Sequence, residues 1–173
     1  QANLTGANLY RANLSTAILQ EADLSKASLI EANLKGKKFP QTNLSEANLS
    51  RANLSGAKFY TNTNLNHTNF SFADLSEADL SELNLKGCNF AGSNLCKANL
   101  NSTNLNAANL CGANLSYGNF SGANLTSADL RGANLQGTNL EKANLKGANL
   151  SGAVNLETAT LTGAIMPDGT IHE

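Results

Sequence analysis

Four carboxylate side chains lie close together in the segment DLSEADLSE, residues 74–82: Asp74, Glu77, Asp79 and Glu82. Clustered carboxylates can bind a metal ion or exchange protons with a substrate. A repeat of about 20 residues, derived below, places Lys97 beside Glu77 and Lys58 beside Asp79. The segment therefore predicts two surface ion pairs, each worth under about 1 kcal/mol, in preference to a metal or catalytic site.

Lysines gather in the segment GKKFPQ, residues 36–41, where Lys37 stands at a position that is small and apolar elsewhere in the chain. An unpaired ammonium group is not stable in a dry interior. We expect a local distortion that turns Lys37 outward. The alternative is a basic contact patch of Lys37, Lys38 and Lys58, in which an anionic partner relieves the repulsion between lysines on adjacent coils.

Other residues with chemical potential are isolated along the chain. Tyr10 and Ile30 form a candidate apolar contact patch on adjacent coils, and Phe72 also points outward. The two histidines and three cysteines have neither ligand spacing nor a CxxC motif, and no HExxH, GxSxG or GxGxxG motif occurs. We expect no catalytic, metal or cofactor site, and reducing cytoplasm is the default compartment.

The sequence that positions these residues repeats every five residues, and the large apolar residue of each repeat is called its centre. Large apolar centres recur at every fifth residue from Leu4 to Phe59, from Leu65 to Leu150, and from Leu156 to Met166, giving 33 centres. The residue before the centre is Asn or Asp in 27 of them, and the residue two before is Ala in 22. Helices repeat at 3.6 residues and strands at two, so neither accommodates this pattern.

A coil of short extended sides and tight corners satisfies the pattern, because Asn, Asp and Gly favour corners. Phenylalanine centres separated by 20 residues favour four units per coil, and so about eight coils stacked about 4.8 Å apart. Parallel crossovers are nearly always right-handed. The expected interior includes these centres: Leu4, Leu9, Phe39, Phe59, Phe70, Phe90, Leu105, Phe120 and Leu150.

Units such as ANLSG, ADLSE, ANLTS and GNFSG resemble the pentapeptide-repeat family, whose signature is A(D/N)LXX. The resemblance covers residues 2–166. It implies an all-β fold, a right-handed quadrilateral parallel β-helix, in which the centre and the residue two before it face inward. It also suggests a bacterial origin.

The pattern predicts one β-helix over residues 1–166, with one-residue insertions near 62 and 154 that form bulges. Residues 167–173 form a tail in which Ile171 is expected to plug the last coil. The chain starts at Gln1, without Met and already inside a repeat, as a fragment or a processed form would. We expect the first coil tip to be capped by further sequence or to pair end to end with another molecule.

The sequence favours a non-enzymatic rod that binds an unknown protein partner. The net charge of −1 gives no drive toward nucleic acid or membrane, and no apolar run reaches the length of a membrane helix. The family supplies an alternative, a DNA mimic that binds the type II topoisomerase gyrase, although the charges mapped on 20-residue coils are mixed. Ice binding is a weaker alternative, because lysines interrupt the candidate Thr ladder on one face.

Overall fold

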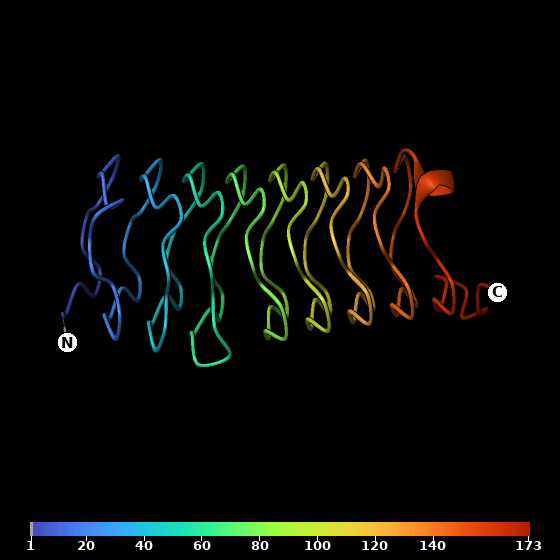
Figure 1. Cartoon of the computed structure of the whole chain (residues 1–173), viewed down its shortest axis with the longest axis horizontal. Helices are drawn as coiled ribbons and strands as arrows, with labels where there is room; N and C mark the ends of the chain where they lie inside the picture. Colours follow the sequence, from blue (N-terminus) through green and yellow to red (C-terminus); the bar gives the residue numbers. More distant parts are fainter. Residues whose placement is uncertain (1) are drawn as a thin grey trace.

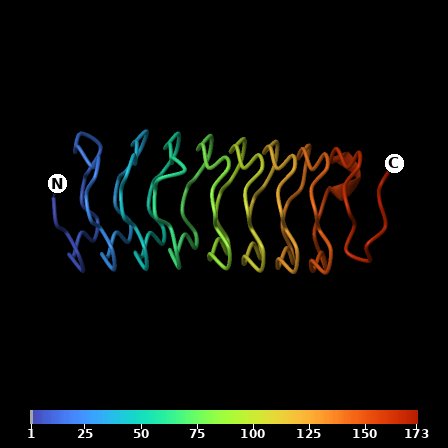
Figure 2. The same cartoon turned by 90° about the horizontal axis from the view of Figure 1, so that it is seen from below.

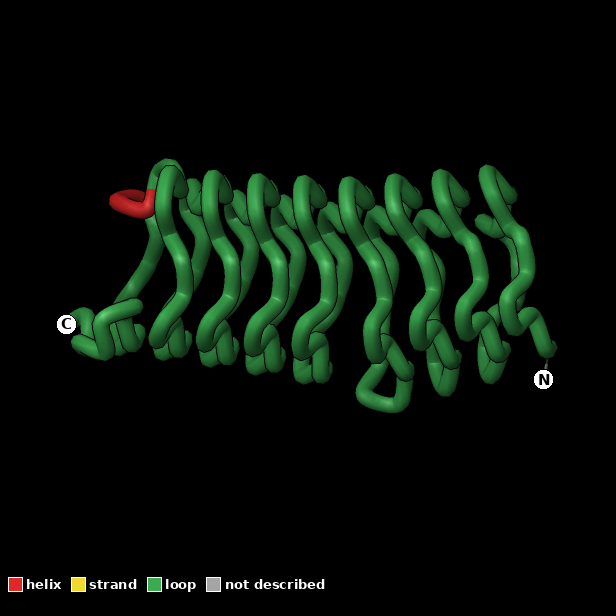
Figure 3. Tube along the Cα trace, turned by 180° about the vertical axis from the view of Figure 1, so that it is seen from behind, coloured by secondary structure: helices red, strands yellow, loops and turns green. Residues whose placement is uncertain are grey.

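The five-residue pattern winds into a stack of coils. The computed structural model describes residues 2–173 as an elongated rod with the two termini at opposite ends (Figure 1, and from below in Figure 2). Isolated parallel bridges join residues 20 positions apart, as in the series Asn84, Asn104 and Asn124. One coil therefore takes the length of four five-residue units. Within residues 2–173 the one helix is the 3₁₀-helix η1 (Leu156–Thr158), and no continuous strand is formed (Figure 3).

Most corners are tight turns with a left-handed residue. In the unit centred on Leu105, the N–H of Ala108 donates to the Leu105 carbonyl at 3.0 Å, and Ala107 has a φ of 55°. A positive φ at the third turn residue is the geometry of a type II turn, and glycine adopts it without strain. This explains why twelve of the 14 glycines stand two residues after a centre.

Adjacent coils are joined by a regular backbone ladder. The N–H of most centres donates to the next coil, as from Leu105 to the Asn124 carbonyl at 2.8 Å, and the N–H of Asn124 donates back to the Thr103 carbonyl at 2.9 Å. A further bond at the corner joins the Ala107 N–H to the Thr126 carbonyl. Because each side holds only a few extended residues, this pairing replaces long strands.

The asparagines before the centres form a second ladder on the surface. The Oδ1 atom of Asn114 accepts the N–H of Ser116 at 3.2 Å, which closes the local turn. The same oxygen accepts the Nδ2 group of Asn134, and the Nδ2 group of Asn114 donates to the Oδ1 atom of Asn94. An Asp can accept these bonds but cannot donate one, so the dual role explains why Asn predominates at this position.

The interior is a buried column of centres and small residues. Phe39, Phe70, Phe90, Phe120 and Leu105 are fully buried and Phe59 is 2% exposed, whereas Leu4, Leu9 and Leu150, near the ends of the rod, are only partly buried. Phenylalanines one coil apart stack face to face, with centroid separations of 4.8 Å for Phe39–Phe59 and 4.9 Å for Phe70–Phe90.

The first insertion protrudes from one side of the rod, where Figure 1 and Figure 3 show an enlarged corner. Bridges across it join residues 21 apart, such as Asn43 and Asn64. The hydroxyl of Thr63 closes the enlarged corner, because it accepts the Tyr60 N–H and donates to the Phe39 carbonyl. The inward pattern then resumes at Leu65, which is 3% exposed.

The second insertion contains η1, which follows Asn155 in the left-handed region at φ 61°. The tail beyond it folds back on the last coil through an antiparallel bridge between Ile165 and Ile171. The expected plug is wrong, however, because the Ile171 side chain is 69% exposed. The tail hydrogen-bonds along the backbone of residues 163–166, because the Gly163 and Met166 N–H groups donate to the His172 and Thr170 carbonyls and the His172 N–H donates to the Ala164 carbonyl.

Among residues 2–173, η1 is the one helix, and its three residues are too few to cross a membrane.

Candidate interaction surfaces

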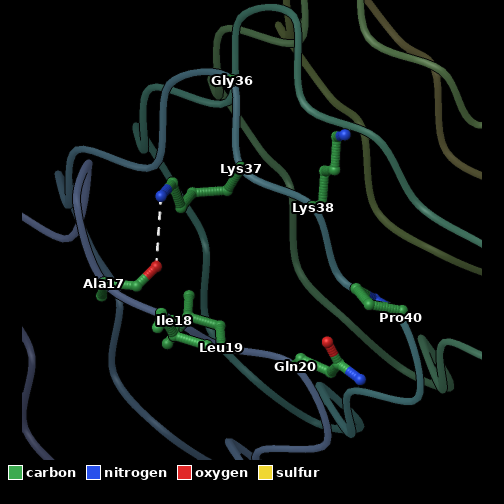
Figure 4. A pocket seen from close by; sticks show the side chains of 8 residues that line it. All are labelled: Ala17, Ile18, Leu19, Gln20, Gly36, Lys37, Lys38 and Pro40. Carbon is green, nitrogen blue, oxygen red and sulfur yellow. Dashed lines mark hydrogen bonds between the residues drawn. The ribbon is translucent and has the colours of Figure 1, made fainter.

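Lys37 disturbs the coil ladder. It is half-buried, and its Nζ atom donates a hydrogen bond to the Ala17 carbonyl of the preceding coil at 3.1 Å (Figure 4). In the regular ladder the Lys38 N–H would donate to this Ala17 carbonyl, just as the Lys58 N–H donates to the Lys37 carbonyl on the next pair of coils. The expected distortion is present, but the ammonium group turns toward the neighbouring coil and not freely into solvent.

The backbone ladder is interrupted at a second place, beside Leu83, and both interruptions have the same steric cause. Leu83, like Lys37, occupies the small inward position, and the bridge between Asn64 and Asn84 is missing just as the bridge between Ile18 and Lys38 is. Ala and Thr at this position let coils approach to about 4.8 Å. We attribute both openings to the larger side chains, which need more room between coils.

The other two lysines of the candidate basic patch, Lys38 and Lys58, make different contacts. Lys38 and Lys58 are paired through their backbones on adjacent coils, and the Lys58 Nζ lies 3.1 Å from the Asp79 carboxylate. Partial burial favours the neutral acid, but the Ser81 hydroxyl and the Lys58 ammonium group outweigh it and lower the pKa of Asp79 below its ordinary value. The predicted Lys58–Asp79 pair is confirmed.

The acidic segment does not gather into one site. Asp74 and Asp79 bridge to different coil partners on successive sides, and Glu77 and Glu82 occupy two separate corners with φ of 59° and 60°. The predicted pair between Glu77 and Lys97 is wrong, because it is not among the ion pairs formed within residues 2–173. Those pairs are Arg11–Glu31, Lys26–Glu46, Lys58–Asp79, Arg131–Asp129 and Lys142–Glu141.

The predicted apolar patch is only partly exposed. Tyr10 is 47% exposed with the Arg11 guanidinium 4.9 Å from its ring centroid, whereas Ile30 on the next coil is half-buried. Phe72 is 62% exposed, and the Arg51 guanidinium lies 5.8 Å from its centroid. Arginine and aromatic side chains together are typical of interface hot spots.

Sequence reasoning missed three exposed side chains, Tyr117, Ile18 and Val154, which are 55%, 89% and 50% exposed. Phe72 and Tyr117 share an arrangement in which the aromatic ring lies over the glycine one coil later. A Cβ atom at Gly92 would be 2.5 Å from the Phe72 ring, and one at Gly137 would be 2.8 Å from the Tyr117 ring. The signal was available as an aromatic corner residue followed 20 residues later by glycine.

The cysteines are free thiols. Cys88 is buried, and desolvation raises its pKa to about 11, which suppresses thiolate chemistry. Its Sγ atom lies 3.4 Å from the Leu65 carbonyl, in the same arrangement that inward threonines use. Among residues 2–173, no three His, Cys, Asp or Glu side chains are grouped so that they could hold a metal ion.

The coil ladder and the filled column define a β-helix built from tandem repeats. The sequence model of the family described as pentapeptide repeats matches eight copies, which span residues 1–36, 27–60, 61–92, 78–116, 88–126 and 123–168. The chain belongs to this family. A comparison with curated protein sequences gives no match.

Solved structures of pentapeptide-repeat proteins resemble the chain. HetL, a protein involved in heterocyst differentiation regulation from the cyanobacterium Nostoc sp. strain PCC 7120, is 36% identical over 99% of this chain and 87% of HetL, with a TM-score of 0.51. Rfr23 from the cyanobacterium Cyanothece 51142 is 29% identical over 77% of this chain and 90% of its own, with a TM-score of 0.26. Trypsin-treated QnrB1, a plasmid-mediated fluoroquinolone resistance protein, is 22% identical over 80% and 76%, with a TM-score of 0.48. The likeness to HetL fits a right-handed β-helix fold for this chain.

Proposed function

We propose that the chain is a non-enzymatic rod of about eight four-sided coils that binds a protein partner through its outward columns. The observation that carries the proposal is the 20-residue register, which repeats each outward position once per coil at a fixed spacing. Inward side chains fill the column, so recognition falls to the outer residues. The resemblance to HetL over nearly the whole chain supports a regulatory role for this binding.

The exposed aromatic corners are the proposed anchors for the partner. Phe72 with Arg51, and Tyr117 on a neighbouring corner column, combine large apolar area with restricted side-chain freedom. Buried aromatic and arginine side chains contribute most of the free energy in typical interfaces. Both residues lie on corners, so they can be changed without disturbing the inward column.

Site-specific photo-crosslinking tests this proposal. A crosslinking amino acid replaces Phe72 or Tyr117, and Ala107, an exposed corner residue without an aromatic ring, is the matched control position. We expect one protein to be captured at an aromatic corner and not at Ala107. The purified partner should then bind the wild type and lose affinity with Phe72→Ser or Tyr117→Ser. Capture that is equal at all three positions contradicts the proposed anchors.

A gyrase supercoiling assay separates this proposal from the DNA-mimic alternative. A duplex mimic needs a continuous acidic stripe, whereas Arg11–Glu31, Lys26–Glu46 and Lys58–Asp79 alternate in sign along the rod. We expect no inhibition by this protein. Inhibition that weakens at high salt would favour the DNA mimic and replace the scaffold proposal.

A further inference from the structure

We propose that the open ladder between Ala17–Gln20 and Gly36–Pro40 binds an oxyanion, either a phosphate or a carboxylate group. These two segments, called the Lys37 slot below, line a surface hollow of about 300 Å³ (Figure 4). The inference is independent of the protein-binding role proposed above, because it concerns a small ligand and a different part of the surface.

Two backbone donors remain unused in the Lys37 slot. On the next pair of coils, the Lys58 N–H donates to the Lys37 carbonyl at 2.8 Å and the Phe39 N–H donates to the Lys58 carbonyl at 3.0 Å. The equivalent donors in the slot are the N–H groups of Lys38 and Leu19, and neither makes a hydrogen bond within residues 2–173. In the regular register, the Lys38 N–H donates to the preceding coil and the Leu19 N–H to the following one, so both would face the space between the first two coils.

Lysine supplies the charge that an oxyanion needs. The Lys37 Nζ atom reaches across the slot to Ala17, and an ammonium group has three protons, so two remain for a ligand. Lys38 extends away from Lys37 in Figure 4 but is exposed and free to turn. Neither lysine takes part in an ion pair within residues 2–173, whereas Lys58 is matched by Asp79. Charge-assisted hydrogen bonds from such groups are about twice as strong as neutral ones.

The opening at Leu83 serves as an internal comparison. It has a hollow of about 270 Å³ lined by Thr61–Asn66, Leu83 and Asn84, and its ladder is also interrupted. It contains no lysine, and the buried Leu83 side chain supplies no donor. The opening at Leu83 therefore has an interrupted ladder but no cation. For this reason we assign oxyanion binding to the Lys37 slot and not to the opening at Leu83.

The test is an NMR titration of the full chain with inorganic phosphate, repeated with acetate, at constant ionic strength set by sodium chloride. We expect saturable shifts of the Leu19 and Lys38 amide signals in the millimolar range. Shifts with phosphate alone identify a phosphate site, and shifts with acetate as well extend it to carboxylates. Absence of saturable shifts with both ions overturns the proposal.

Lys37→Ala is the decisive variant, because it restores the common small residue. We expect the ladder to close, which should protect the Lys38 amide from hydrogen exchange, and phosphate affinity to fall about tenfold or more. Lys86→Ala, which removes an exposed lysine on a distant coil, should leave binding unchanged. Equal loss in both variants, or full binding by a folded Lys37→Ala protein, would show that the slot is not the site.

Discussion

At the residue scale, one asparagine oxygen links a local turn to the neighbouring coil. The Oδ1 atom of Asn114 accepts one backbone and one side-chain donor, while the amide nitrogen donates to the coil before it. The same three bonds are made by several other asparagines, among them Asn69, Asn99 and Asn119. The stacked amides therefore join coils outside the column as the backbone ladder does within it.

Replacing Asn114 with Asp separates the two roles. The carboxylate keeps the turn acceptor but cannot donate to Asn94, so we expect a loss of about 0.5–1.5 kcal/mol at neutral pH. Asn114→Ala removes both roles and should cost more. Urea unfolding of the three proteins measures the difference, and an Asp variant less stable than the Ala variant would contradict the dual role.

The Asp79 carboxylate gives the rod a pH dependence with a definite sign. Its folded pKa lies below the ordinary unfolded value of about 3.9. Its contribution to stability is therefore complete above that value and is lost as the pH falls through the folded pKa. We expect the stability difference between wild type and Asp79→Asn to be constant above about pH 5 and to shrink in acid. A difference that persists unchanged below both pKa values would contradict this assignment.

At the scale of one coil side, inward hydroxyls bridge to the preceding coil. Thr103 donates from Oγ1 to the Leu80 carbonyl at 2.9 Å, and Thr42, Thr68 and Thr138 do the same on their sides. Ser93 occupies the same position, but its buried Oγ atom has no hydrogen-bond partner within residues 2–173. Burial of a hydroxyl without a partner is unfavourable.

The two hydroxyls predict opposite effects of alanine. Ser93→Ala removes an unsatisfied buried group and should raise the free energy of unfolding by about 1 kcal/mol, whereas Thr103→Ala should lower it by about 1 kcal/mol. Chemical denaturation of both variants provides the measurement. If Ser93→Ala were the more destabilising change, the Ser93 hydroxyl would have a partner in solution.

The coil sides and their register follow from the sequence, whereas the paths of some individual side chains do not. The five-residue period predicted the inward column, and the spacing of Phe39 and Phe59 agrees with the bridge register, because both follow from chain geometry alone. The path of the Lys37 side chain and the exposure of Ile171 were not predictable. Each depends on how one side chain competes for a particular carbonyl or edge, which the period does not encode.

At the scale of the whole molecule, packing varies along the rod. Each coil contacts only its neighbours, so central coils are covered on both sides and outer ones on one. Leu105 is fully buried, whereas Leu9 is partly buried. The same residue type at the same position of the unit therefore makes different contributions to stability.

Alanine substitutions measure this gradient. Leu105→Ala should cost about 2–5 kcal/mol, since it leaves a cavity in a closed column. Leu9→Ala should cost clearly less, because its side chain already contacts solvent. Thermal unfolding of the two variants compares them directly, and equal losses would mean that the first coil is covered in solution.

The left-handed corners have a consequence for how such a surface can change over evolutionary time. Within residues 2–173, eighteen non-glycine residues have φ between 54° and 61°, a conformation that costs an L-residue roughly 1 kcal/mol relative to glycine. Glycine would adopt this conformation at each of these positions without that cost. Because the corners lie outside the column, selection can add or erase their side chains one at a time. The rod can thus acquire a new binding specificity while its fold stays constant.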